Sequence, residues 1–127
     1  MPMMSDPDYF VRQIIAQRIG VAQLKHMIDD PDPEVRRVVA QRIPASWLLR
    51  LASDPDAAVR LEVARRLPPD LLARLRHDPD WRVRYEVATR IAADTISELA
   101  EDRDDFVREI ARSRLSGGET RLREIPT

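Results

Sequence analysis

Apolar and polar positions recur along the chain with a period of 24 residues. Asp6, Asp30, Asp54, Asp78 and Asp102 mark five starts at this constant spacing, with no gap. Each start opens a segment that reads Asp-x-Asp, two variable residues, Val-Arg, two variable residues, two apolar residues in most copies, one variable residue, Arg, and Leu or Ile. A period of about 20 to 50 residues is typical of a solenoid, in which each unit packs its apolar face against its neighbours. We therefore expect a single repeat domain, 1–127, with repeats at 6–29, 30–53, 54–77 and 78–101 and a terminal half-repeat at 102–115.

The first half of each repeat predicts an α-helix. Val59, Val63 and Leu67 lie at i, i+4 and i+8, which forms one apolar stripe over about three turns. Asp54 followed by Pro55 is typical of a helix N-cap with proline at the first helical position, and the second Asp then lies near the positive end of the helix dipole. We therefore expect each helix to begin at the proline.

The second half of each repeat is shorter and begins with residues that break helices, such as Pro44 and Pro68. Ser46, Asp70 and Asp94 are candidate N-caps for the segments that follow. Apolar residues there are spaced three apart, which fits either a short α-helix or a 3₁₀ helix, and the sequence leaves this open. These pairs are Leu24 with Met27, Leu48 with Leu51, Leu72 with Leu75, and Ile96 with Leu99.

The segments DPDPEVRRVVAQRI and DPDAAVRLEVARRLPPDLLARL resemble the leucine-rich repeat variant family, which is related in style to HEAT-type repeats. The resemblance covers about residues 6 to 115. It implies an all-α fold, an α-solenoid whose right-handed superhelix alternates α-helices with 3₁₀ helices. Some family members attach the repeats to a cysteine-ligated iron-sulfur module and are associated with nitrogen fixation. An accessory role in nitrogen fixation or metallocluster maturation is therefore one alternative function.

Composition narrows the possible chemistry. The chain has no cysteine, so we expect no iron-sulfur cofactor held by this chain. No nucleophile and base pair or phosphate-binding loop is present, and the paired acids recur as helix caps rather than as metal-binding loops. We therefore expect no enzyme activity, catalytic residue, cofactor or metal. With no apolar run of about 18 residues, we expect a cytoplasmic protein that does not enter a membrane.

Two columns of arginines recur through the repeats. The first lies six residues after each leading Asp, the relationship by which HEAT-type repeats build an Asp–Arg ladder, and we interpret it as structural; binding of phosphate in a groove is the alternative. The second lies at the helix C-termini, where the helix dipole favours a cation; the alternative is a ridge that meets an acidic partner or a nucleic acid, with Arg42, Arg66 and Arg90 as candidate contacts. The ladder residues are Arg12, Arg36, Arg60, Arg84 and Arg108 with Asp30, Asp54 and Asp78, and the second column is Arg18, Arg42, Arg66, Arg90 and Arg114.

Large apolar residues at variable positions point to a partner, because the repeat does not require them. Trp81 and Tyr85 lie at i and i+4 outside the valine stripe, and Leu61 holds the position of Tyr85 one repeat earlier. These three residues are candidates for one exposed patch that binds another protein. Alternatively, they cover the second half of a neighbouring repeat. Twenty-one basic and 22 acidic residues give a net charge of -1, which disfavours nucleic acid as the partner.

The two ends depart from the repeat. Phe10 with Ile14 and Phe106 with Ile110 are apolar where inner repeats carry charged residues, which suggests tail packing or a homodimer through the terminal repeats. Arg112 replaces the small residue that recurs as Ala16, Ala40, Ala64 and Ala88, so we expect a terminal cap followed by a flexible tail at 116–127. The function we expect is a non-enzymatic repeat scaffold for protein–protein interaction.

Overall fold

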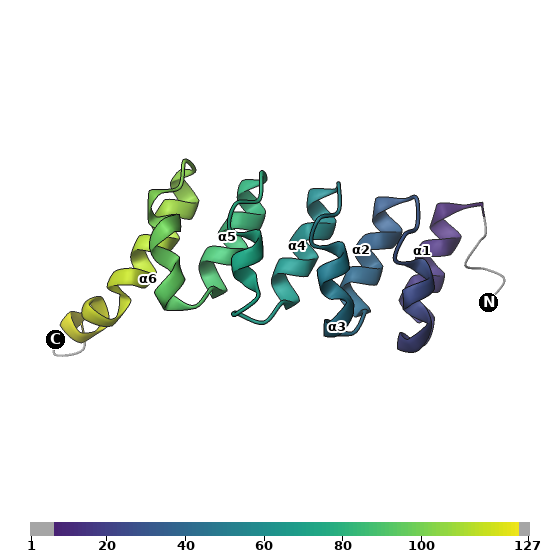
Figure 1. The fold of residues 1–127 in the computed structure, drawn as a ribbon, viewed down its shortest axis with the longest axis horizontal. Coiled ribbons are helices and arrows are strands. Elements are labelled where there is room, and N and C mark those ends of the chain that lie inside the picture. The colour runs from purple at the N-terminus through teal and green to yellow at the C-terminus, as the bar shows by residue number, and fades with distance from the viewer. Residues whose placement is uncertain (1–6, 125–127) are drawn as a thin grey trace. The chain divides into compact units, whose positions relative to one another are not determined.

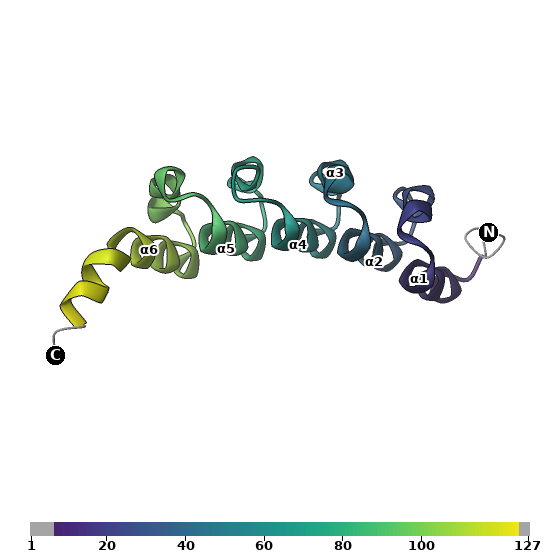
Figure 2. The same cartoon turned by 90° about the horizontal axis from the view of Figure 1, so that it is seen from below.

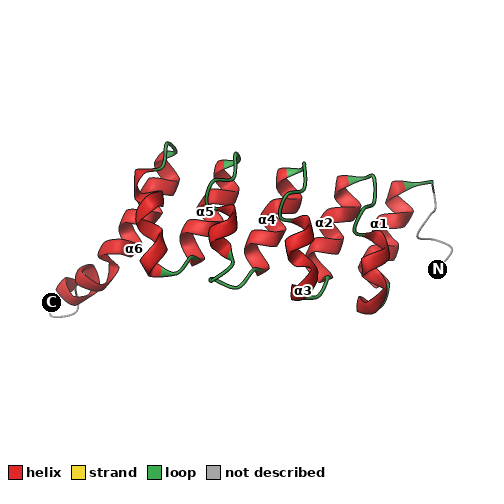
Figure 3. Ribbon diagram, viewed as in Figure 1, coloured by secondary structure: helices red, strands yellow, loops and turns green. Residues whose placement is uncertain are grey.

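The computed structural model describes residues 7–124, with the side chains of residues 7–117. These residues form helices joined by short loops, and none of them lies in a strand (Figure 3). The fold class is therefore all-α, as the sequence predicts. The chain divides into two compact units, Met1–Leu67 and Pro68–Thr127, each a short stack of helical repeats. The division falls inside the repeat at 54–77, and Asp6, the first expected repeat start, lies outside the described residues.

Within each unit the α-helices form one layer and the shorter helical segments form a second layer (Figures 1 and 2). Successive α-helices of a unit pack side by side, as α1 packs on α2 and α5 on α6. Unit 1 contains α1 (Tyr9–Arg18), η2 (Val21–Met27), α2 (Pro33–Arg42), α3 (Ala45–Leu48), η3 (Leu49–Leu51) and α4 (Ala57–Arg66). Unit 2 contains η4 (Leu72–Leu75), α5 (Trp81–Arg90), η5 (Ala93–Glu101) and α6 (Asp105–Glu124).

The core of each unit is made of the aliphatic residues that set the repeat pattern. In unit 1, Val35, Val39 and Ile43 of the α2 stripe are fully buried, as is Leu48. Burial of each such side chain stabilises the fold by about 1.5 to 3 kcal/mol. The recurring alanine is also fully buried at Ala40, where a larger side chain would meet its packed neighbours.

The helices begin two residues later than the sequence predicts, so the assignment of the first Asp as N-cap is wrong. The cap is the second Asp: the Asp32 side chain accepts a hydrogen bond from the backbone N–H of Glu34, and Asp56 does the same for Ala58. Asp30, the leading Asp, instead accepts from the backbone N–H of Asp32 at 2.9 Å. The Asp30 carboxylate also accepts hydrogen bonds from the ladder arginine of the preceding repeat.

The second halves of the repeats are 3₁₀ helices, with one α-helical turn, α3, before η3. Ser46, Asp70 and Asp94 are not their caps, because no side chain caps any of these described segments. Instead, the backbone carbonyl of the residue just before each segment, Pro44 or Ala92, accepts the hydrogen bond that closes its first turn. The backbone N–H of Trp47 donates to the Pro44 carbonyl at 2.9 Å, and that of Thr95 to the Ala92 carbonyl at 3.0 Å.

Helix α6 continues through much of the segment that the sequence predicts to be a flexible tail. It runs to Glu124, so only residues 125–127 of the expected tail lie outside the described residues. Two successive glycines favour a helix end but do not impose one, since glycine costs only about 1 kcal/mol relative to alanine. No described glycine has a positive φ, so Gly117 does not form a left-handed cap. Within the described residues, no helix is both long and apolar enough to cross a membrane.

Candidate interaction surface

The first arginine column joins successive repeats in unit 1. The Arg12 guanidinium donates from Nε to Asp30 Oδ2 at 2.8 Å and from Nη2 to Oδ1 at 3.2 Å, and Arg36 pairs with Asp54 in the same way at 2.7 and 3.2 Å. The Asp54 side chain is only 4% exposed. Arg36 also donates to the backbone carbonyl of Asp30 at 2.7 Å, which ties the loop of its own repeat to the next repeat. The hydrogen bond with Asp54 raises the pKa of Arg36 against the opposing effect of burial.

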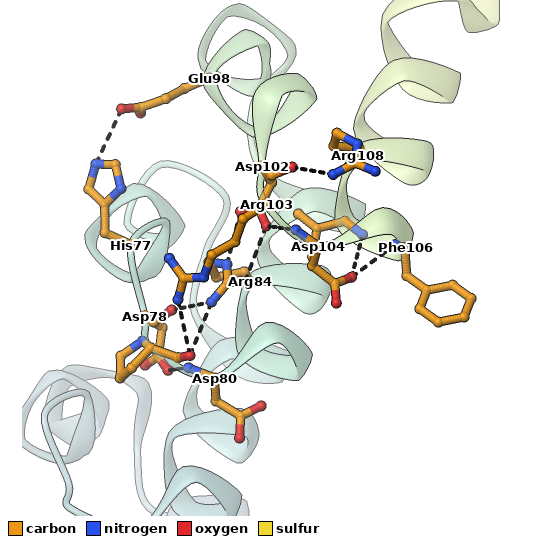
Figure 4. A network of polar contacts seen from close by, with 12 residues as sticks. His77, Asp78, Asp80, Arg84, Glu98, Asp102, Arg103, Asp104, Phe106 and Arg108 are labelled. Carbon is orange, nitrogen blue, oxygen red and sulfur yellow. Dashed lines mark hydrogen bonds and ion pairs between the residues drawn. The ribbon is translucent and has the colours of Figure 1, made fainter.

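The same arrangement occurs in unit 2 between Arg84 and Asp102 (Figure 4). Their Nε–Oδ2 distance is 2.9 Å, and both side chains are less than a tenth exposed. Burial raises the pKa of Asp102, but hydrogen bonds from the Arg84 side chain and the Asp104 backbone N–H outweigh it, so the pKa lies below its ordinary value. Arg60 and Arg108 each donate to the carbonyl of their own leading Asp, at 2.7 and 2.8 Å. Asp78 is buried and accepts from the Asp80 backbone N–H.

The second arginine column lies at the helix C-termini, where Arg42, Arg66 and Arg114 contact the preceding α-helix and Arg18 of the first helix is exposed. Arg42 donates to the Ala16 carbonyl at 2.7 Å, and Arg66 donates to the carbonyls of Ala40 and Ile43 at 3.0 and 2.6 Å. Arg114 bonds Ala88 and Ile91 in unit 2 in the same way. These bonds satisfy carbonyls that a helix end leaves without partners. Arg90 is half-buried at the end of α5, so it too presents only part of its side chain to solvent.

Three aromatic side chains cluster on the surface of unit 2. The rings of Trp81 and Tyr85 on α5 meet edge to face, with 6.3 Å between centroids. Trp81 also stacks on Phe106 of α6, with 5.7 Å between centroids and 29° between planes. The three side chains nevertheless remain 41%, 36% and 60% exposed. Figure 4 shows the Phe106 ring pointing away from the polar network at the start of α6. We call Trp81, Tyr85 and Phe106 the aromatic cluster.

The equivalent seam between α2 and α4 in unit 1 is ionic. Arg37 and Glu62 hold the repeat positions that Tyr85 and Ile110 hold in unit 2, and they approach to 3.7 Å. The Gln41 side chain also donates to Glu62 Oε1 at 3.2 Å. The positions of Trp81 and Phe106 are held at this seam by Pro33 and Ala58. None of the three aromatic positions is therefore aromatic at the seam between α2 and α4, which means that packing of the repeat does not require aromatic residues there.

A groove lies beside the aromatic cluster. It has a volume of about 290 Å³ and is lined by Tyr85, Phe106, Glu109, Ile110 and Ser113. Its walls therefore come from α5 and from two turns of α6. Exposed aromatic rings next to a groove are typical of surfaces that bind another protein.

The structure brings together some of the residues singled out in the sequence and separates others. Trp81 and Tyr85 lie together, whereas Leu61 belongs to unit 1 and is half-buried. Phe106 joins the cluster, which the sequence did not indicate, since Phe106 and Trp81 hold different positions of the repeat. The charge pair of Arg37 and Glu62, at adjoining positions of successive repeats, is the sequence signal that reveals which positions meet across the seam.

The apolar residues of the first repeat and a possible metal site are the remaining candidates. Phe10 on α1 is 59% exposed and Ile14 is half-buried, and self-association through these ends stays a prediction. Among the described residues, no group of three or more His, Cys, Asp and Glu is placed to hold a metal ion.

Comparison with known proteins relates the chain to helical repeat proteins. Residues 57–80 match the model of a family described as leucine rich repeat variant. A solved structure described as a leucine-rich repeat variant with a novel repetitive protein structural motif is 38% identical and superposes with a TM-score of 0.85. The match covers 90% of this chain and 48% of the other, so the chain spans about half the length of that protein. No curated protein matches the sequence. The family and the fold are those of a repeat scaffold and not of a known enzyme family.

Proposed function

Because the chain is a repeat protein of the leucine-rich repeat variant family, we propose that it is a non-enzymatic scaffold that binds another protein through the aromatic cluster on α5 and α6. Repeat proteins of this kind present extended surfaces on a frame of stacked units, and variable residues on that frame select the partner. The Asp–Arg pairs and the buried aliphatic stripe form the frame. Trp81, Tyr85 and Phe106 provide the contacts.

The observation that carries this proposal is the exposure of three neighbouring aromatic rings at repeat positions that are not aromatic at the equivalent seam of unit 1. Tyr and Trp are enriched among the residues that dominate binding energy at protein interfaces. The rings also contact one another, which reduces the side-chain freedom that would be lost on binding.

Affinity capture from the native cell tests the proposal. The tagged wild type, a Tyr85→Ala/Phe106→Ala variant and a Phe10→Ala variant are compared by quantitative mass spectrometry. Phe10 is a matched control, because it holds the position of Phe106 in the first repeat and is equally exposed, at 59% against 60%. We expect a protein that is captured by the wild type and by Phe10→Ala and is lost by the double variant.

The same experiment separates the other functions that the sequence suggests. Salt-sensitive recovery of nucleic acid that is unchanged in the double variant would favour the second arginine column. Recovery of proteins of metallocluster assembly would favour the accessory role. A set of captured proteins that is identical for all three forms would contradict binding through the aromatic cluster.

A further inference from the structure

The groove beside the aromatic cluster has the chemistry of a cation site. Of the five residues that line it in the described part of the chain, Glu109 alone carries a charge. The rings of Tyr85 and Phe106 line it together with the Ile110 side chain and Ser113. Aromatic faces attract a cation through their quadrupole, and a carboxylate pairs with it directly.

The Glu109 carboxylate is available for such a pair. Within residues 7–117, whose side chains are described, it forms no ion pair, although three arginines in this range lie on the same helix. Arg114 donates to the carbonyls of Ala88 and Ile91. Arg108 is engaged by the Asp102 carbonyl at 2.8 Å and by the Asp105 carboxylate. Arg112 donates to the Ala100 carbonyl at 2.9 Å and lies 3.7 Å from Glu101. Both guanidiniums are therefore committed to the start of α6 and the end of η5.

In unit 1, arginine side chains lie beside a carboxylate and over an aromatic ring. The seam between α2 and α4 contains a guanidinium beside a carboxylate, Arg37 with Glu62. The Arg50 guanidinium lies over the Trp47 ring at 4.2 Å from its centroid. In unit 2, Tyr85 stands in place of the arginine and Ile110 in place of Glu62. The carboxylate of the groove comes instead from Glu109, one residue before Ile110.

We infer that the groove of unit 2 binds an arginine side chain of a partner protein, with the guanidinium against the rings of Tyr85 and Phe106 and paired with Glu109. This inference rests on the proposed function and names the chemistry of the partner. Arginine fits better than lysine, because its planar guanidinium stacks on aromatic faces, binds a carboxylate through two N–H groups and is less strongly hydrated. Trp81, stacked on Phe106, holds one wall of the site in place.

Titration of peptide pools onto the full chain tests the inference. Each pool contains short labelled peptides with a fixed central Arg, Lys, Gln or Glu and randomised flanking residues, and binding is followed by fluorescence polarisation. We expect the Arg pool to bind most tightly. Phe106→Ala weakens its binding by about tenfold or more, and Glu109→Gln weakens it by about threefold while leaving the Gln pool unchanged. Phe10→Ala is the control and changes neither pool.

The contrary outcomes separate this inference from the proposed function. If all pools bind equally and all are weakened by Phe106→Ala, the surface binds peptides but the preference for arginine is wrong. If Glu109→Gln leaves the preference for the Arg pool intact, the assignment of the carboxylate is wrong. If no pool binds the wild type, or if Phe106→Ala binds as the wild type does, the arginine site is wrong, and only the capture experiment then decides whether the cluster binds a protein.

Discussion

At the scale of single residues, the leading Asp and the repeat Arg act together. Their spacing in the sequence predicts a contact between successive repeats, and the pairs Arg12–Asp30 and Arg36–Asp54 have this geometry. The sequence did not reveal which Asp is the N-cap, because each repeat has two acidic residues two positions apart and either one could cap the helix. In the repeats that begin at Asp30 and Asp54, the first carboxylate pairs with the arginine of the preceding repeat and the second caps the helix. The second Asp, Asp8, also caps α1, which no repeat precedes in this sequence.

Replacement of Arg36 measures the contribution of one such pair. Arg36→Ala leaves the buried Asp54 carboxylate without its guanidinium, so we expect the free energy of unfolding to fall by about 1 to 3 kcal/mol. Arg65→Ala is the control: its side chain is 52% exposed and pairs with Glu62 of the same helix at 3.3 Å, so its loss costs less than about 1 kcal/mol. Urea unfolding followed by circular dichroism compares the two. Equal losses would mean that the Asp54 pair is an ordinary surface contact.

The Arg84–Asp102 pair also makes stability depend on pH. The pKa of Asp102 is lower in the folded protein than its ordinary value. The folded state therefore binds this proton less readily than the unfolded state, and the stabilisation is fully present above the ordinary pKa of about 3.9. It is lost as the pH falls through the lowered folded value. We expect the unfolding midpoint of the wild type to exceed that of Asp102→Asn at neutral pH, and the difference to shrink below about pH 4. A difference that is independent of pH would contradict the ionised pair.

At the scale of elements, apolar periodicity was sufficient to predict the helices but not their ends. The stripe of Val35, Val39 and Ile43 locates α2, because three turns of burial outweigh local preferences. The end of α6 was mispredicted, since glycine only weakens a helix and the decision rests on small energies. The nature of the second halves was left open because residues spaced three apart satisfy both kinds of helix.

Substitution of Gly117 tests whether α6 continues past Leu115. A Cβ built at Gly117 meets nothing within 4 Å, so Gly117→Ala adds helix propensity worth up to about 1 kcal/mol without a clash. We expect a stronger helical signal at 222 nm and a higher melting temperature. Gly20→Ala is the control, since its Cβ also meets nothing but its backbone is extended, with φ -63° and ψ 147°. If both variants match the wild type, the segment after Leu115 is not helical in solution.

At the scale of the whole molecule, the sequence predicts the class of protein better than its contacts. The 24-residue period alone leads to a helical repeat scaffold, because each unit must bury its apolar face on the next. The aromatic cluster was predictable only in part. Trp81 and Tyr85 share one helix face, but their meeting with Phe106 depends on the lateral offset of α5 and α6, which the period does not specify. Leu61, which has the matching repeat position, lies in the other unit and is half-buried.

Site-specific photocrosslinking in the native cell tests the central claim most directly. A photoreactive amino acid replaces Ser113, which lines the groove, or Gln17, which holds the same repeat position in α1 and is likewise exposed. If the aromatic cluster binds a partner protein, illumination yields a discrete protein adduct at Ser113 that disappears in the Tyr85→Ala/Phe106→Ala background, and none at Gln17. Equal adducts at both positions, or an adduct at Ser113 that survives loss of the rings, would contradict it.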